Sequence, residues 1–172
     1  AQHANGAVPT TAPEYVVFEG PGMDAFAESP EWGCTFVVLP FMYYETYGDD
    51  SLIRKYYNGM RRYIDYMTTR ANDGIVSFGL GDWYDYGDFR AGFSRNTPVP
   101  LVATAHYYMV VRYLVEAARM LDNRYDVAYY THLGEEINKA FHREFYHKDT
   151  RQYGTGSQCS NCLLYTSDAA DE

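Results

Sequence analysis

The feature that most restricts the fold is a pair of helical segments joined by a very short turn. The first segment, residues 32–48, is an apolar and aromatic run that closes at Gly48, a residue typical of helix C-termini. Pro40 lies inside this run, so we expect a kinked helix or a late helix start. The second segment begins directly after Asp49 and Asp50. A connection this short predicts an antiparallel αα-hairpin.

The second helix of this hairpin is predicted over residues 51–70 and is amphipathic. Its charged side chains fall mostly on one side, as expected for a helix with one solvent-exposed face. The apolar side chains recur at the period of an α-helix. They predict a buried stripe of Leu52, Tyr56, Met60 and Ile64, with Tyr63 and Met67 alongside.

The same plan occurs a second time further along the chain. Residues 100–121 are strongly helical, with Pro100 placed at the start, where proline is tolerated. A turn at Asp122 and Asn123 leads into a second helical segment, residues 125–146. Its apolar positions again follow the helical period. They are Val127, Tyr130, Leu133, Ile137, Phe141 and Phe145.

Three less regular segments surround the two hairpins. Residues 1–31 are rich in proline and glycine and show no helical period, so they predict a loop-rich N-terminal segment. Residues 72–100 form a long loop between the hairpins, and residues 147–161 resemble the start of a further loop and helix. We therefore predict an all-α fold of the α/α toroid type. The alternative, an α-solenoid, usually repeats at about 34 residues, and this period is absent.

The charge and the cysteine content exclude several kinds of partner and scaffold. The net charge is −9, whereas a nucleic-acid partner requires a basic face, so we expect no nucleic acid. No apolar run approaches the roughly 18 residues of a membrane span. Three cysteines are too few for a disulfide scaffold. No secretory signal is visible, and the compartment stays open.

The loop between the hairpins carries the best candidate for a functional site. Long loops between regular helices are often functional, and this one mixes carboxylates with aromatic rings. Sugars are bound by such a mixture, because the ring stacks against their C–H face and the carboxylate accepts from their hydroxyl groups. The alternative is a capped turn whose aromatic side chains belong to the core. The residues concerned are Asp82, Trp83, Tyr84, Asp85, Tyr86, Asp88 and Phe89.

Two smaller points complete the set of candidates. Trp32 stands beside Glu31 at the start of the first helix, and this pair is either a second sugar-binding feature or an anchor for the helix start. The histidines form no metal-ligand set, since His142 and His147 are five residues apart and do not share a helical face. We therefore expect no metal site and no cofactor.

The last residues of the chain have an unusual origin. Residues 162–172, CLLYTSDAADE, resemble the translation of a transposase adapter used in DNA sequencing. We therefore expect native protein over residues 1–161 and adapter read-through over residues 162–172. Cys159 and Cys162 form a CxxC spacing, but its second cysteine then comes from the adapter, so we expect no redox or metal function for this pair.

Six segments follow one another along the chain in a recognisable order, namely NGAVPTTAPEYVVF, SPEWGCTFVVLPFMYYETYGD, YYNGMRRYIDYM, GLGDWYDYG, TPVPLVATAHYYM and YGTGSQCSN. Together they resemble the six-hairpin catalytic domain of bacterial α-L-rhamnosidases, family 78 of the glycoside hydrolases. The resemblance covers essentially all of residues 1–161. Cys34 and Cys159 stand where this family usually has small or hydroxyl residues, and His106 where an aromatic is common.

This resemblance implies a fragment of an (α/α)6 six-hairpin toroid, with about two and a half hairpins present. It implies a parent enzyme that hydrolyses terminal α-L-rhamnose from glycosides or polysaccharides with inversion, in the periplasm or outside the cell. Both catalytic carboxylates of the family lie outside the segments matched here, so the fragment alone is expected to be inactive. Trp32, Asp82 and Trp83 match positions that line the rhamnose pocket.

Two other functions remain open at this stage. The first is another (α/α)-barrel glycosidase or a polysaccharide lyase. The presence of both SPEWG and GDW argues against this alternative. The second is a non-catalytic helical carbohydrate-binding protein, which would keep Trp32 and Trp83 without any catalytic carboxylate pair.

Overall fold

The computed structural model describes residues 2–168, with side chains over residues 2–163. The protein is mainly helical, as predicted, and its two short β-hairpins were not expected. The helices are α1 (Asp24–Ala27), α2 (Pro30–Gly33), α3 (Thr35–Tyr47), α4 (Ser51–Arg70), α5 (Val99–Met120), α6 (Arg124–Phe145) and α7 (Gln158–Asp168). The strands are β1 (Asp85–Gly87), β2 (Phe89–Gly92), β3 (Tyr146–His147) and β4 (Gln152–Tyr153).

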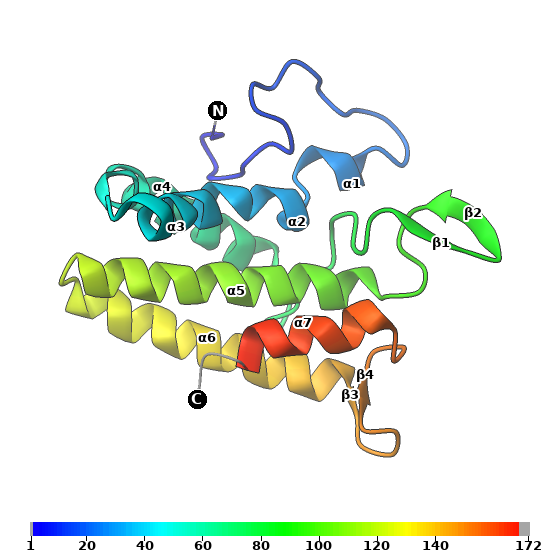
Figure 1. Ribbon diagram of the computed structural model, residues 1–172. Coiled ribbons are helices and arrows are strands. Elements are labelled where there is room, and N and C mark those ends of the chain that lie inside the picture. Colours follow the sequence, from blue (N-terminus) through cyan, green and yellow to red (C-terminus); the bar gives the residue numbers. More distant parts are fainter. Residues whose placement is uncertain (1, 169–172) are drawn as a thin grey trace.

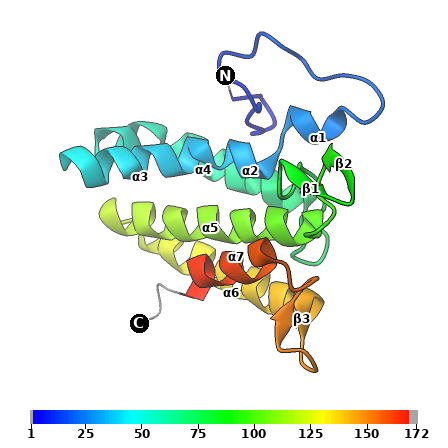
Figure 2. The ribbon, with the colours of Figure 1, turned by 45° about the vertical axis from the view of Figure 1, so that its right-hand side comes forward.

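The two predicted αα-hairpins are present, and α5 lies at the centre of the arrangement. Helices α3 and α4 form the first hairpin, and α5 and α6 form the second (Figure 1). Helix α5 contacts α2, α3 and α4 on one side and α6 and α7 on the other, and a second view separates these layers (Figure 2). The buried face of every long helix is therefore turned toward α5 or its hairpin partner.

Helix α3 follows the sequence pattern closely at its end and less closely at its start. It ends at Gly48, whose φ of 68° is left-handed and favours glycine. Pro40 lies inside the helix, and α3 continues past it. The short α2 takes up the first residues of the predicted segment, so α3 itself begins at Thr35. Pro40 therefore does not mark the start of the helix, which begins five residues before it.

Helix α4 buries a face that differs from the predicted stripe in its first half. Tyr56 is 38% exposed, and the neighbouring Tyr57 is buried instead. The reason is a contact with the second hairpin, since the Tyr57 hydroxyl donates to Asp126 of α6 at 2.6 Å. Leu52 is likewise only half-buried, and Ile53 takes the core position. The predicted positions in the second half are buried, namely Met60, Tyr63, Ile64 and Met67.

Helix α6 and the segment after it agree better with the sequence. Of the predicted apolar positions, Val127 and Leu133 are half-buried and the other four are buried. The predicted further helix is α7, which follows the β3–β4 hairpin. Of the residues expected to be adapter read-through, 169–172 lie outside the described part of the chain.

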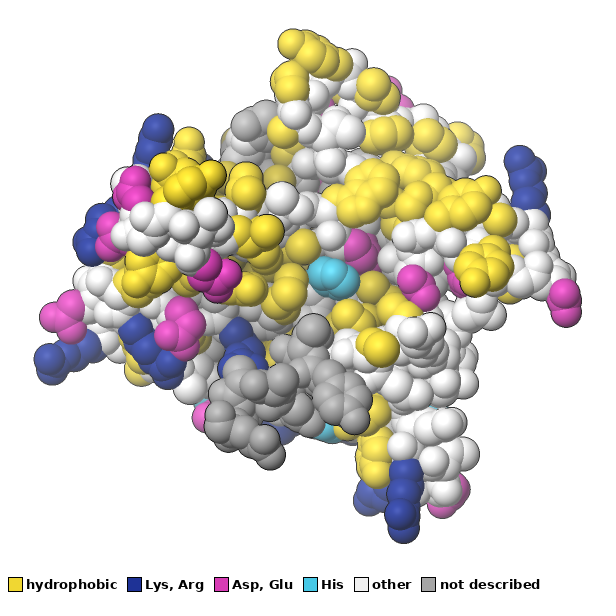
Figure 3. Space-filling model, in the orientation of Figure 1, with side chains coloured by type: hydrophobic (Ala, Val, Ile, Leu, Met, Phe, Trp, Pro, Cys, Tyr) yellow, Lys and Arg dark blue, Asp and Glu magenta, His cyan; other side chains and the backbone are white. Residues whose placement is uncertain are grey.

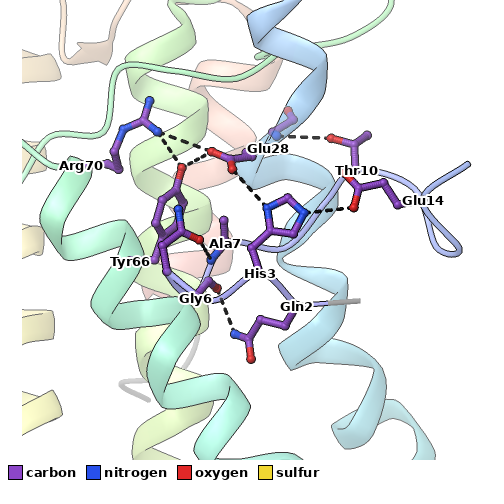
Figure 4. A network of polar contacts seen from close by, with 11 residues as sticks. Gln2, His3, Gly6, Ala7, Thr10, Glu14, Glu28, Tyr66 and Arg70 are labelled. Carbon is purple, nitrogen blue, oxygen red and sulfur yellow. Dashed lines mark hydrogen bonds and ion pairs between the residues drawn. The ribbon is translucent and has the colours of Figure 1, made fainter. Parts of the chain in front are cut away.

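The N-terminal segment is irregular, as predicted, and a polar network attaches it to α4 (Figure 4). The Nε2 atom of His3 lies 3.0 Å from Glu14, and its Nδ1 atom lies 3.6 Å from Glu28. Glu28 also accepts a short hydrogen bond from the Tyr66 hydroxyl, which in turn accepts from Arg70 at 2.6 Å. These contacts place the segment that precedes α1 against the C-terminal half of α4.

A second, smaller core lies where α5 begins. It is separate from the main core between the two hairpins, and it joins α5 to the end of α6, to β4 and to α7. This packing fixes the end of α5 at which the long loop arrives. Its buried members are Leu101, Val102, Ala105, Phe141, Phe145 and Tyr153. None of the helices among residues 2–168 is long and apolar enough to cross a membrane.

Candidate functional site

The three predicted site residues lie on two segments at one end of α5. Trp32 belongs to α2 and is 38% exposed. Asp82 and Trp83 belong to the loop before β1, and both are half-buried. Hydrophobic side chains gather over the region of α1, β1 and β2, with a basic side chain at its outer edge (Figure 3). The structure therefore leaves Trp32 more accessible than Trp83.

Glu31 connects the two segments directly. Its Oε1 atom accepts from the backbone N–H of Gly81 at 3.0 Å, and its Oε2 atom accepts from that of Leu80 at 3.3 Å. The hydroxyl of Ser29 donates a short hydrogen bond to the same carboxylate and accepts from Leu80 N–H at 3.1 Å. Since Trp32 follows Glu31 and Asp82 follows Gly81, this contact sets the distance between the two parts of the candidate site.

The glycines of this loop are required by the close approach. Gly79 has a φ of +124°, and a Cβ atom there would lie 2.6 Å from Glu31 Oε2. Gly81 has a φ of +66°, and its Cβ would lie 2.7 Å from that of Ser94. Any other residue at either position meets both an unfavourable backbone conformation and a steric overlap. The GLG sequence is thereby explained by the contact with Glu31 and Ser94.

Trp83 lies in a cluster of aromatic rings. Its ring centroid is 5.2 Å from that of Phe26, 5.5 Å from that of Phe93 and 5.2 Å from that of Tyr84, each in an edge-to-face arrangement. Tyr84 itself is 61% exposed. Edge-to-face pairs of this kind hold an indole in one orientation. Trp83 therefore has two roles. Its ring packs against other aromatic side chains, as in the alternative of a core residue, and it also lines an open hollow.

Asp82 lines a second hollow of about 510 Å³, which shares none of its described lining residues with the hollow of Trp83. The Thr97 hydroxyl donates to Asp82 at 3.3 Å and lies 2.7 Å from the hydroxyl of Ser157, the residue before α7. Cys159 of α7 lines the same hollow. Burial, followed by the charge of Asp82, raises the pKa of this thiol to about 11, so it stays protonated at neutral pH. The negative charge of this hollow therefore comes from the carboxylates of Asp82 and Asp85, and the Cys159 thiol adds none.

Asp85 has a structural role that the sequence did not reveal. It is 6% exposed, and its Oδ2 atom accepts from the backbone N–H groups of Arg95 at 2.6 Å and Asn96 at 2.7 Å. Its Oδ1 atom accepts from the Asn96 side chain at 2.6 Å and from Tyr86 N–H at 2.9 Å. Both oxygens are therefore used to close the β1–β2 loop. Of the two interpretations of this loop, Asp85 therefore fits that of a capped turn.

These hydrogen bonds predict that the β1–β2 loop loosens in acid. The N–H groups of Asn96 and then Arg95 hold the pKa of Asp85 below its ordinary value of 3.8. A carboxylate with a lowered pKa stabilises the folded loop above its unfolded pKa, and this contribution is lost as the pH falls through the folded value. We expect exchange of the Asn96 amide to accelerate, relative to the core amides, as the pH is lowered from about 6 to about 3.

Two variants make this experiment specific. Asp85→Asn removes the charge, so the Asn96 amide should exchange faster already at neutral pH and show little further change in acid. Asp88→Asn alters an exposed carboxylate of the same loop and should behave like the unmodified chain. An Asn96 amide whose protection is the same in Asp85→Asn as in the unmodified chain would contradict this role of Asp85.

No metal site is found in the part of the chain whose side chains are described. Within it, no group of three or more His, Cys, Asp and Glu side chains is arranged to hold an ion. The carboxylates near Trp83 are instead bound to N–H and O–H donors. The chemistry available here is the binding of neutral polar groups next to aromatic rings.

The geometry described above agrees with the comparison with known families. The model of the bacterial α-L-rhamnosidase six-hairpin glycosidase domain matches residues 1–171. The chain belongs to this family. The resemblance stated from the SPEWG and GDW motifs is therefore confirmed, and the fold is that of a part of the six-hairpin domain.

Individual relatives support the same assignment. An α-L-rhamnosidase of Formosa agariphila is 27% identical in an alignment of length 144 that covers 78% of this chain and 15% of that protein. A second one from the same organism is 22% identical in an alignment of length 173 that covers 100% of this chain and 18% of that protein. The chain thus spans less than a fifth of the length of these relatives.

Two solved structures of α-L-rhamnosidases superimpose well on this chain. That of Dictyoglumus thermophilum gives a TM-score of 0.74 at 26% identity and covers 86% of this chain and 16% of its own. That of Streptomyces avermitilis, solved with L-rhamnose, gives a TM-score of 0.72 at 21% identity and covers 99% and 17%. These likenesses confirm the six-hairpin fold expected for this rhamnosidase-family chain.

Proposed function

We propose that this chain is the central part of an α-L-rhamnosidase, which removes terminal α-L-rhamnose from glycosides or polysaccharides with inversion. The observation that carries the proposal is the contact of Glu31 with Leu80 and Gly81, because it unites the SPEWG and GDW motifs in one place. Family membership and the rhamnosidase relatives support it. The substrate is a rhamnose-containing glycoside or polysaccharide.

Inversion requires chemistry that the aspartates of this site do not supply. One carboxylic acid must protonate the leaving oxygen and a second carboxylate must activate water, at a separation of roughly 6.5–9.5 Å. Asp85 uses both its oxygens to close a loop. Asp82 accepts from the buried Thr97 beside the second hollow. We therefore assign the acid and the base to other parts of the longer enzyme, and this chain alone is inactive.

The contribution of this chain is to bind the sugar. Trp32 and Trp83 offer apolar surfaces for the C–H face of rhamnose and for its methyl group, which replaces the hydroxymethyl of ordinary hexoses. Asp82 accepts hydrogen bonds from sugar hydroxyls next to Trp83. The aromatic rings and the carboxylate together form a surface that binds a neutral sugar without a cofactor.

The test uses the two tryptophans as reporters, because the chain contains no others. Each gives one indole N–H signal in an NMR spectrum of the isotope-labelled chain, and Trp32→Phe and Trp83→Phe assign the two signals. L-Rhamnose should shift both signals with a dissociation constant on the order of millimolar, as expected for a small ligand on an open site. L-Mannose differs only by a hydroxyl on the methyl group and should bind more weakly.

The variants separate binding at this site from binding elsewhere. Asp82→Asn keeps the shape of the side chain and should weaken rhamnose binding at the Trp83 signal. Glu45→Gln, on an exposed position of α3, should leave both titrations unchanged. A folded chain in which neither indole signal moves at saturating L-rhamnose would overturn the assignment of the site.

We further propose that native protein covers residues 1–161 and that residues 162–172 are adapter read-through. The supporting observation is the match of CLLYTSDAADE, in register, to a translated adapter. Sequencing the source locus with long reads tests this directly. Coding sequence that continues after Asn161 with other residues is expected, and genomic reads that contain the same final residues would contradict it.

A further inference from the structure

The hollow that Trp83 lines differs in charge from the hollow that Asp82 lines, and no described residue lines both. The hollow of Trp83 measures about 500 Å³ and lies against the β1–β2 hairpin. Its aromatic wall consists of Trp83, Tyr84 and Phe93, and its charged side chains are Arg90 and Arg95. None of the described residues that line it is acidic.

The two arginines are available to a ligand. Arg90 and Arg95 are both exposed, and neither has a carboxylate within ion-pair distance among the residues whose side chains are described. The guanidinium of Arg95 lies 5.1 Å from the centroid of the Phe89 ring, a contact that orients it.

The aromatic wall suits a pyranose ring. Tyr84 is 61% exposed and Phe93 is 49% exposed, so both rings present apolar surface to solvent. Trp83 holds an edge-to-face contact with each of them, which fixes the wall as a unit. A guanidinium beside such a wall adds the geometry that binds a carboxylate or a sulfate through two parallel hydrogen bonds.

The charges around Trp83 are therefore segregated. The hollow of Asp82 and Asp85 repels an anion, and that of Arg90 and Arg95 attracts one. A neutral rhamnose beside Asp82 with an anionic neighbour beside the two arginines matches these charges, whereas the reverse order places the anion beside carboxylates. This arrangement gives the site a polarity along the substrate.

We propose that the Arg90–Arg95 hollow binds an anionic sugar, one that carries a carboxylate or a sulfate ester, as the residue attached to the terminal rhamnose. This inference rests on the proposed function, because Trp83, which lines this hollow, is also a ring proposed to contact the rhamnose. It identifies the preferred substrates as acidic rhamnose-containing polysaccharides. The ring is held by the aromatic wall and the anion by the two guanidinium groups.

The experiment follows the Trp83 indole signal of the labelled chain with four probes. They are methyl β-D-glucuronide, a sulfate ester of methyl β-D-glucoside, the neutral methyl β-D-glucoside and sodium sulfate. We expect at least one anionic sugar to bind about three- to tenfold more tightly than the neutral sugar, with the preference falling as salt is added. Which anionic probe binds shows whether the carboxylate or the sulfate is recognised.

Charge-matched variants complete the design. Arg90→Gln with Arg95→Gln should reduce binding of the anionic sugar to that of the neutral one. Arg119→Gln with Arg124→Gln, which removes the same charge around the α5–α6 turn, should not. Equal binding of the anionic and neutral sugars overturns the proposal, and so does a Trp83 shift with sodium sulfate alone that equals the one with the sugar.

The outcome can be distinguished from failure of the proposed function. If L-rhamnose shifts the two indole signals and no anionic sugar does, the rhamnose site stands and the anionic site is refuted. If L-rhamnose shifts neither signal, the rhamnose assignment itself is refuted, whatever the anionic sugars do at Trp83.

Discussion

Replacing Asp126 by alanine is expected to lower the free energy of unfolding by about 2–3 kcal/mol. Asp126 is 2% exposed and accepts from the Tyr57 hydroxyl at 2.6 Å and from the Asn123 side chain at 2.8 Å. Its Oδ2 atom also lies 3.3 Å from Nε of Arg61. The substitution leaves these donors without an acceptor between the two hairpins. The Nε atom of Arg61 is buried, but the side chain as a whole is partly exposed and keeps contact with water, which limits the loss.

Urea unfolding at neutral pH measures this effect, and two variants calibrate it. Tyr57→Phe removes one donor but keeps the carboxylate and its other partners, so it should cost about 1 kcal/mol. Asp65→Ala removes an exposed carboxylate of α4 whose contact with the Tyr130 hydroxyl is 3.5 Å long, so it should cost less than about 0.5 kcal/mol. If Asp126→Ala were no less stable than Asp65→Ala, the hairpins would be joined by apolar packing alone.

Replacing Glu31 by alanine is expected to release the loop that carries Asp82 and Trp83. The Gly81 N–H loses its acceptor, and Leu80 N–H keeps only the hydroxyl of Ser29. Hydrogen bonds to a carboxylate are stronger than neutral ones, so amide exchange at Gly81 should accelerate about 10- to 100-fold. The Trp83 indole should at the same time respond less to L-rhamnose, because the two motifs are no longer held together.

Hydrogen exchange and the indole titration measured on one sample separate this effect from unfolding. The core amides of α4 and α5 should keep their protection in Glu31→Ala. Glu31→Gln retains one acceptor oxygen and should give an intermediate acceleration at Gly81. Glu45→Ala, an exposed glutamate on α3, should change neither measurement. Unchanged exchange at Gly81 in Glu31→Ala would show that the loop is fixed by its glycines and aromatic rings instead.

The sequence predicted the helices well because each long helix carries a local signal. The left-handed glycine after α3, the short turns and the apolar period are all readable within a few residues. The buried face of α4 was predicted less well, because Tyr56 and Tyr57 are chemically equivalent in a local pattern. The choice between them depends on Asp126, which is 69 residues away from Tyr57. No periodicity contains that information.

The candidate site shows the same limit. Trp32, Asp82 and Trp83 were found through motifs, whereas the function of Glu31 depends on a contact across 50 residues of chain. The glycines at 79 and 81 were a visible signal of a close approach, although not of its partner. The sequence left Asp85 as either a sugar ligand or a turn cap, because its four N–H partners lie in β1 and after β2, and this hairpin was not predicted.

The proposed rhamnosidase activity is tested most directly by the stereochemistry of hydrolysis, measured on the longer enzyme of which we propose this chain to be a part. An aryl α-L-rhamnoside is incubated with the enzyme, and the first sugar released is observed by proton NMR before it mutarotates. The account predicts β-L-rhamnose as the first product, with kcat/KM reduced in Trp83→Ala and unchanged in Glu45→Ala. Release of α-L-rhamnose first, or no release from a folded and complete enzyme, would contradict it.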